Sequence, residues 1–332
     1  MEDNDKNIKN NISNYVITLE EIKQAREDIY KTNQIYRTTL LKNCEIYSDQ
    51  LKNKHFSLNL KLENMQNQGS HKIRGIMNTT KNIDKNDKLV TSSAGNFGRS
   101  LSYVSKLMGY DTTIIMPNTA PIERVNYCKN YGAKVEITER KNIPIKEKEY
   151  VNNGYKFVKS YDDLDGIRGL ASIGLEILED LPDADIIIIG VGGGGVIAGV
   201  SAAVKLSGSK AKVYGVEPEG AAKMYNSIKE GKPHTLESID TFVHGLAAPY
   251  AGTITYEFVK EYCEEIILVN DKEIKNAMEI LYKDYKLVVE GAGAACLAAV
   301  ISNKIDVKGK KVVCVLTGGN ISYSEYNTIF SS

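Results

Sequence analysis

The sequence predicts an α/β protein with two open, mostly parallel, twisted sheets flanked by helices. Strand-like apolar runs alternate with helical stretches, the alternation occurs in two separate parts of the 332-residue chain, and several strand-like runs lead directly into glycine- or hydroxyl-rich turns. Such alternation arises when each helix returns the chain to the start of the next parallel strand. The hydrophobic share of 42% is sufficient for a core of this kind.

The N-terminal part begins with residues 1–14, which are rich in Asp, Asn and Lys and predict a disordered tail. The segment Thr18–Glu21 has the spacing of a capping box and predicts a helix that runs to about Lys31. Alternation over residues 58–63 predicts the end of a strand, and the polar stretch 81–87 predicts a domain boundary.

We therefore expect a small domain over residues 85–160 and a large domain formed by residues 15–84 and 161–332. The elements expected in the small domain are strands at 88–91, 112–116 and 134–138 and helices at 101–107 and 121–131. The large domain is expected to contain helices at 72–77, 173–178, 196–204 and 291–301, a further helix capped by Asp271, and strands at 186–189, 213–216, 266–269 and 312–316. Four consecutive isoleucines at 186–189 predict a strand buried on both faces.

Lys72 stands in the turn Gly-Ser-His-Lys-Ile-Arg-Gly, between two glycines that let the backbone bend. A lysine amine at a strand-to-helix turn suits Schiff-base chemistry when burial or nearby cations lower its pKa. The alternative is a solvated lysine in a basic loop, and the remaining motifs of the chain argue against it.

Glycines 192–195 follow a buried strand and precede a helix of small residues. The N–H groups at such a helix start bind phosphate, so the run predicts a phosphate site. A turn needed only for close packing is one alternative. A dinucleotide site is another, because Gly190-x-Gly192-x-x-Gly195 fits the fingerprint and Glu217 ends the next strand. Four consecutive glycines form a wider concave loop than a single tight turn does. The wider loop favours a terminal phosphate monoester over a dinucleotide.

Two further turns follow strands, where open α/β sheets bind ligands. Ser93-Ala94-Gly95-Asn96 offers backbone N–H groups and a hydroxyl for a carboxylate, and the Asn96 amide can donate to a phenolate. Thr317 precedes Gly-Gly-Asn and can donate its hydroxyl to a ring nitrogen. Ordinary helix capping and turn initiation are the alternatives for these two turns.

The composition excludes several classes of protein. Lys plus Arg and Asp plus Glu both number 42, which argues against a nucleic-acid or membrane-surface partner. The five cysteines are scattered, which suits reduced thiols in a cytoplasmic protein, and no His cluster has metal-ligand spacing. The start of the chain has no apolar segment typical of a signal peptide, and the most apolar run is too short to span a bilayer.

The order of these motifs resembles that of the pyridoxal-phosphate enzymes of the tryptophan-synthase-β fold type, in the threonine/serine dehydratase and serine racemase group. The resemblance covers about residues 16–325. It implies that pyridoxal 5′-phosphate lies in the cleft between the large and small domains. It also implies a cytoplasmic homodimer that acts on a small amino acid.

The resemblance implies a role for each motif residue. The implied catalytic residue is Lys72, which would also be the Schiff-base lysine. The implied cofactor-binding residues are Lys72, Asn96, Gly192, Gly193, Gly194, Gly195, Val196 and Thr317. The implied substrate-binding residues are Ser70, Ser93, Ala94, Gly95 and Asn96.

The chain departs from the pattern of the group at several positions. Racemases of the group carry a second serine where this chain has Ala94, and the missing hydroxyl disfavours racemisation. At the cation site of the group, Glu217 and Ala221 match but Lys223 replaces an acidic residue, so we expect no metal site. Further departures, which leave the preferred substrate open, are Phe97, Ser160, 169–172 and 244–249.

The implied reaction is β-elimination, by a dehydratase or ammonia-lyase, of a β-hydroxy-L-amino acid such as L-threonine or L-serine. Lys72 would remove the Cα proton, and the products would be a 2-oxo acid and ammonia. Within the same class, the alternatives are a serine racemase and a dehydratase of 3-hydroxyaspartate or phenylserine. From other classes, they are an NAD-dependent oxidoreductase that uses the loop 190–195 and a catalytically silent amino-acid sensor.

Overall fold

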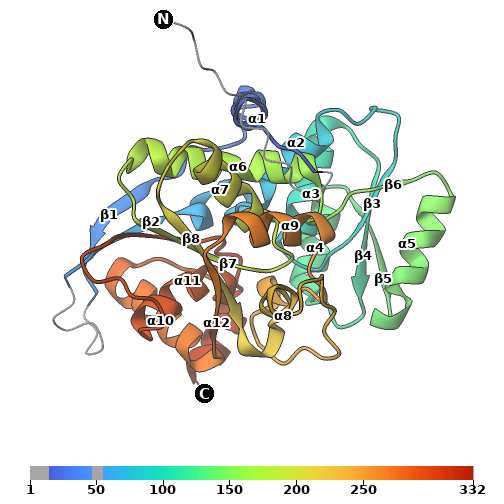
Figure 1. Ribbon diagram of the computed structural model, residues 1–332. Helices are drawn as coiled ribbons and strands as arrows, with labels where there is room; N and C mark the ends of the chain where they lie inside the picture. The colour runs from blue at the N-terminus through green and yellow to red at the C-terminus, as the bar shows by residue number, and fades with distance from the viewer. Residues whose placement is uncertain (1–14, 47–54, 332) are drawn as a thin grey trace, which may run out of the picture.

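The computed structural model describes residues 15–46 and 55–331 and contains two sheets (Figure 1). The expected tail at residues 1–14 lies outside the described residues. The larger sheet has the strand order β1-β2-β10-β7-β8-β9, and the smaller has the order β5-β4-β3-β6. Only the β1–β2 pair is antiparallel among the described strands. The expected fold class of two mostly parallel sheets is therefore confirmed.

The larger sheet is a three-layer structure. Its strands are β1 (Leu40–Cys44), β2 (Ser57–Lys61), β7 (Ile186–Gly190), β8 (Lys212–Pro218), β9 (Glu265–Val269) and β10 (Lys311–Val315). One face is covered by α10 (Asp271–Tyr285) and α11 (Gly291–Ile301). The other is covered by α6 (Leu164–Asp180), α7 (Gly195–Leu206) and α9 (Thr253–Tyr262). Ile186 and Ile188 lie in the first core and Ile187 and Ile189 in the second, so this strand is buried on both faces as expected.

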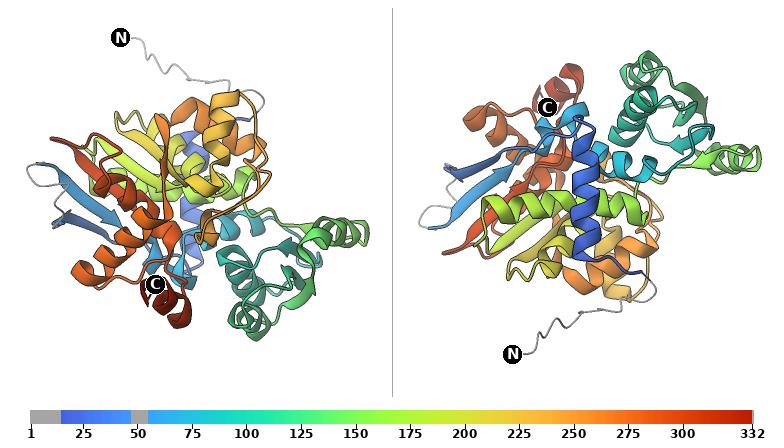
Figure 2. Two further views of the ribbon diagram at one scale, coloured as in Figure 1. Left: turned by 90° about the horizontal axis from the view of Figure 1, so that it is seen from below. Right: turned by 90° about the horizontal axis from the view of Figure 1, so that it is seen from above.

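The smaller sheet forms a separate lobe, seen in Figure 2 as the teal and green part of the chain. Its strands are β3 (Leu89–Ser92), β4 (Thr112–Pro117), β5 (Lys134–Thr138) and β6 (Lys156–Phe157). The helices α3 (Asn96–Met108), α4 (Ile122–Asn130) and α5 (Ile143–Asn152) surround it. The core under α3 also contains Ile73 and Ile76 of α2 (Lys72–Thr80), so the helix that begins at Lys72 packs against this lobe.

The remaining helices are α1 (Leu19–Lys31), α8 (Lys223–Glu230) and α12 (Tyr323–Ser331). The capping box expected at the start of α1 is present, with Thr18 and Glu21 bonded reciprocally. The expectation that Asp271 caps α10 is wrong, because the Asn270 side chain accepts from the Glu273 N–H and Asp271 is the first helical residue. No helix in the described part of the chain is both long and apolar enough to cross a membrane.

Candidate active site

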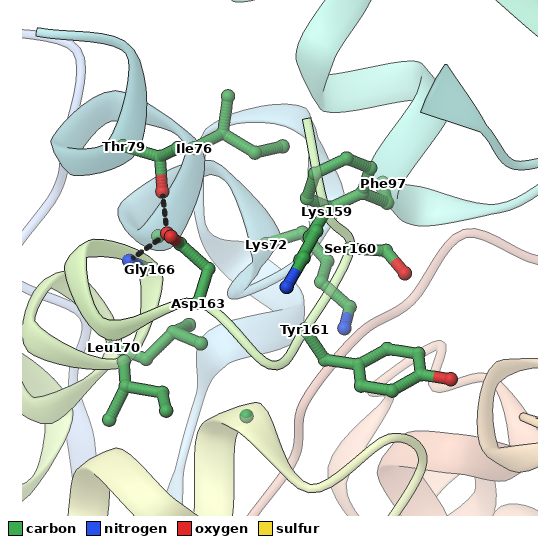
Figure 3. Close-up of a pocket in the computed structure, with 13 residues that line it drawn as sticks. Lys72, Ile76, Thr79, Phe97, Lys159, Ser160, Tyr161, Asp163, Gly166 and Leu170 are labelled. Atoms are coloured by element: carbon green, nitrogen blue, oxygen red, sulfur yellow. Dashed lines mark hydrogen bonds between the residues drawn. The ribbon is translucent and has the colours of Figure 1, made fainter. Parts of the chain in front are cut away.

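A pocket at the carboxyl ends of the strands contains Lys72. It is lined from the large-sheet part by Lys72, Tyr161 and Gly195 and from the small lobe by Phe97 of α3. Figure 3 shows Lys72, Lys159 and Tyr161 around this pocket. Lys72 is the first residue of α2, and the chain reaches it from β2 through two short 3₁₀ helices, Glu63–Met65 and Asn67–Gly69, and not through a single turn.

The surroundings of Lys72 favour a neutral amine. Burial lowers the pKa of the Lys72 amine to about 8, and the negative charge of Glu290 opposes this shift. An amine with such a pKa is partly unprotonated near neutral pH, which nucleophilic and general-base chemistry both require.

The glycine loop lies between β7 and α7 and is shaped by its neighbours. Gly194 has a φ of 96°, which favours glycine, and it is the N-cap residue of α7 without a capping side chain. A Cβ on Gly193 would lie only 2.1 Å from Cγ of Tyr161, so the Tyr161 ring packs directly over the loop. The first N–H groups of α7 have no partner within the helix and are therefore available to an anion.

Asn96 begins α3 and is bonded at both ends of its amide. Its Nδ2 donates to Oε1 of Glu290 at 2.6 Å, and its Oδ1 accepts from Nδ2 of Asn320 at 2.7 Å. The structure therefore brings together the 93–96 turn and the 317–320 turn, which lie more than two hundred residues apart in the sequence.

Glu290 is a site residue that the sequence analysis missed. It immediately precedes α11, and its carboxylate does not cap that helix but reaches Asn96 instead. Burial raises the pKa of Glu290 to about 7, while the Asn96 hydrogen bond and the charges of Arg124 and Lys72 oppose the shift. An acidic residue between a valine pair and the glycine-rich start of a helix was the available signal.

Thr317 lies two residues beyond the end of β10, and its backbone oxygen accepts twice from His71. The His71 N–H donates at 3.1 Å and the ring Nδ1 lies 2.9 Å from the same oxygen. Since a carbonyl oxygen only accepts, Nδ1 carries the proton, and burial lowers the pKa of His71 to about 3. His71 Nε2 and the Ser70 hydroxyl, on either side of this turn, are buried without a partner among the described residues.

The Ser93–Asn96 turn is more open than the other turns. The sequence favours the backbone N–H groups of this turn as partners of a carboxylate. The Ser93 N–H is not one of them, because it donates to Ile115 O at 3.1 Å. The Ser93 hydroxyl accepts from the Gly95 N–H at 3.3 Å, and a Cβ on Gly95 would meet no protein atom within 4 Å. Ala94 lies between them and carries no polar side chain.

Glu217 is unavailable to a ribose. Its carboxylate is fully buried and accepts from the Lys223 amine and from the N–H groups of Met224 and Tyr225. The dinucleotide alternative depended on a free acid at this strand end, and the structure removes it. No group of metal-ligating side chains occurs in the described ranges.

A second missed feature is an ion pair between the small lobe and the C-terminal helix. Arg124 of α4 forms an ion pair at 2.7 Å with Glu325 of α12, and its other terminal nitrogen donates to Ala94 O at 3.4 Å.

Tyr161 is a further residue that was missed, and it lines the pocket together with Lys159 and Ser160. An aromatic residue in a polar loop was the only sequence signal for it.

A buried lysine at a helix start, beside a glycine loop with free N–H groups, defines a class: enzymes that bind a phosphate-bearing carbonyl compound through a Schiff base. The model of the family described as "Pyridoxal-phosphate dependent enzyme" matches residues 32–318, and the chain belongs to this family. Its cofactor is pyridoxal phosphate.

The chain is similar to several characterised members. It is 37% identical to the L-threonine ammonia-lyase of Thermotoga maritima, over 95% of this chain and 79% of that protein. It is 35% identical to the catabolic L-threonine dehydratase TdcB of Escherichia coli strain K12, over 94% and 96% of the two chains. The structure of the serine racemase of Dictyostelium discoideum superposes with a TM-score of 0.82 at 32% identity, covering 92% of this chain and 99% of that one.

The described residues fit pyridoxal phosphate. Lys72 supplies the amine, the glycine loop supplies phosphate-binding N–H groups, and Asn96 retains one N–H beyond the one bonded to Glu290. Next to Lys72, the buried Ser70 hydroxyl and His71 Nε2 lack partners in the described part of the chain. A polar molecule bound beside Lys72 would satisfy such atoms.

Proposed function

We propose that this protein is an ammonia-lyase that converts a β-hydroxy-L-amino acid, L-threonine or L-serine, into a 2-oxo acid and ammonia. The observation that carries the proposal is the Lys72 amine, whose pKa is lowered to about 8 by burial and which lines a pocket beside the glycine loop. The relatives named as threonine ammonia-lyase and threonine dehydratase support the choice of reaction.

The proposed cofactor site has four parts. Lys72 holds the cofactor through its amine, and residues 192–196 hold its phosphate at the start of α7. Asn96 donates to its 3′-oxygen, and the Thr317 hydroxyl donates to its ring nitrogen. When bound, pyridoxal phosphate supplies the electron sink for the reaction.

The proposed substrate site is formed by Ser70 and the turn of Ser93, Ala94, Gly95 and Asn96. The Ser70 and Ser93 hydroxyls bind the substrate carboxylate, and the open space at Gly95 admits it. Lys72 would hold the cofactor and would also act as the base that removes the Cα proton, because its amine lines the pocket and burial lowers its pKa. The Tyr161 ring packs against the glycine loop at Gly193.

The proposed domains are residues 15–84 with 161–332 and residues 85–160. The Lys72 pocket is lined from both parts.

A cytoplasmic homodimer belongs to the same proposal, supported by five free cysteines and by the resemblance. Analytical ultracentrifugation of the purified protein tests the dimer, and a single monomeric species would refute it.

The test is a product assay with a matched lysine control. Purified wild-type protein is incubated with L-serine, L-threonine, 3-hydroxyaspartate and phenylserine, and 2-oxo acid and ammonia are measured. Lys72→Ala should lose turnover with every substrate, whereas Lys159→Ala, at the exposed lysine of the same pocket, should retain it. Ordinary turnover by Lys72→Ala would refute the role of the amine. The substrate panel separates the threonine/serine lyase from a dehydratase of bulkier hydroxy-amino acids.

A further inference from the structure

We propose that Glu290 is a positioning residue, which holds the Asn96 amide in the one orientation that presents an N–H to the 3′-oxygen of the cofactor. The inference deepens the proposed function and rests on the role assigned there to Asn96.

The Asn96 amide has three relevant hydrogen-bonding positions, and the protein occupies two of them. One N–H donates to Glu290 Oε1 at 2.6 Å, and the Oδ1 accepts from Asn320 Nδ2 at 2.7 Å. The Asn320 amide is itself fixed, because its Nδ2 also donates to Gln68 O at 2.7 Å. The second N–H of Asn96 is the donor that remains.

Glu290 and Asn320 together exclude the flipped amide. After a flip, the Asn96 oxygen would face the Glu290 carboxylate and its nitrogen would face the Asn320 nitrogen. An ionised carboxylate only accepts, so the first contact would place two acceptors together. The flipped amide would then present its oxygen, and not an N–H, to the 3′-oxygen of the cofactor.

The surrounding backbone leaves room for this bond. Glu290 is the N-cap residue of α11 but makes no capping bond, and its own N–H donates to Gly318 O at 3.1 Å. A Cβ on Gly318 would lie 2.5 Å from Glu290 Oε1 and 3.2 Å from Asn96 Nδ2. The glycine that follows Thr317 is therefore required for the Glu290–Asn96 contact.

The strength of the hydrogen bond between Asn96 and Glu290 depends on the charge of Glu290. The groups that act on Glu290 are Asn96 of α3, Lys72 of α2, Arg124 of α4 and Glu325 of α12, and its pKa is about 7. Above this pH the bond is charge-assisted; below it the carboxyl is neutral and the bond is weaker. A donor to the 3′-oxygen favours the ionised form of that oxygen, so the form of the bound cofactor reports the position of Asn96.

The experiment measures the ratio of the two visible absorption forms of the bound cofactor between pH 5.5 and 9, without substrate. In the wild type the ratio should change with an apparent pKa near 7. Glu290→Ala should shift it by about two- to tenfold above pH 7, the range of one hydrogen bond, and by less below pH 7, where the wild-type bond is weaker. Glu290→Gln keeps an acceptor, so it should retain much of the ratio but lose the pH dependence. Glu325→Gln, which removes a nearby carboxylate without a bond to Asn96, should retain the ratio at high pH and should still titrate, at a lower pH than the wild type because the Glu325 charge raises the pKa of Glu290.

Two results would overturn the proposal: a Glu290→Gln protein whose ratio still titrates like the wild type, or a Glu325→Gln protein that reproduces the Glu290→Ala shift. Circular dichroism verifies the fold of each variant, and Glu290→Gln provides the test if Glu290→Ala does not fold. The spectra need no turnover, so they are interpretable even if the wild type proves not to be an ammonia-lyase. Absence of ammonia release would refute the proposed function alone.

Discussion

The amine of Lys223 lies 2.8 Å from Oε1 of Glu217, and neither side chain has exposed surface. Three backbone oxygens complete the surroundings of the amine: Leu246 O at 3.0 Å and Val191 O and Ala221 O at 3.2 Å. These oxygens come from separate turns, one of which leads into the glycine loop. Burial lowers the pKa of the Lys223 amine, and the negative charge of Glu217 and its hydrogen bond to the amine oppose that shift. Lys223 therefore points into the protein and pairs with Glu217.

We predict that the protein needs no divalent cation, because Lys223 supplies the positive charge inside this ring of oxygens. Activity and melting temperature should be unchanged after exhaustive EDTA treatment. Lys223→Asp should gain a melting temperature that rises with added Ca²⁺ or Mg²⁺, since two carboxylates and three carbonyls are suitable ligands. Lys229→Asp, at an exposed lysine of the same helix, is the matched control and should gain none. A loss in EDTA that metal reverses in the wild type would contradict the prediction.

Ala94 predicts elimination with little racemisation. No side-chain hydroxyl at this position can return a proton to the second face of Cα, although the relatives in structure include serine and aspartate racemases. With L-serine, pyruvate should form and D-serine should remain a minor product, measured by chiral chromatography. Ala94→Ser should increase the D-serine share, and Ala94→Gly serves as the control without a hydroxyl. D-serine as the main wild-type product would show that another residue supplies the proton.

Much of the fold was predictable because its strands and helices carry strong local patterns. The helix Gly291–Ile301 and the strand Lys134–Thr138 have the bounds expected from the sequence. The helix α5 was missed because none of its residues is buried, so it has no apolar periodicity. The two-residue strand β6 was missed because it is shorter than any strand pattern.

The site was predictable only where a turn has a sequence motif. Lys72 and the glycine loop were recognised because their backbone conformation and chemistry are local. Glu290 was not recognised, since its importance comes from Asn96, a residue 194 positions away. The Lys223–Glu217 pair could be suggested from the sequence because the two residues are only six positions apart.

The pKa of Lys72 predicts how cofactor capture by the apoenzyme depends on pH. Only the neutral amine attacks the carbonyl of pyridoxal phosphate, so the rate should rise with pH and level off above about 8. A lysine of ordinary pKa, about 10.4, would still gain rate between pH 8.5 and 10. Stopped-flow absorbance after mixing apoenzyme with cofactor measures this profile. A rate that continues to rise tenfold per pH unit above pH 9 would contradict the shifted pKa.

A buried charge network beneath α2 provides the last prediction. Arg74 forms ion pairs with Glu63 and Glu176, Lys61 pairs with Glu176, and all four side chains have no exposed surface. Two positive and two negative charges balance, so removal of one leaves a buried charge without its partner.

Glu176→Gln should therefore lower the free energy of unfolding by about 3–5 kcal/mol. Glu179→Gln is the matched control on the same helix: its carboxylate pairs with Arg26 and Arg37 but is 45% exposed, so its loss should cost about 0–1 kcal/mol. The double variant Lys61→Met with Glu176→Gln restores the charge balance and should recover part of the loss. Urea unfolding followed by circular dichroism measures all three. Equal losses for Glu176→Gln and Glu179→Gln would show that burial of the network contributes nothing specific, because the two substitutions differ mainly in exposure.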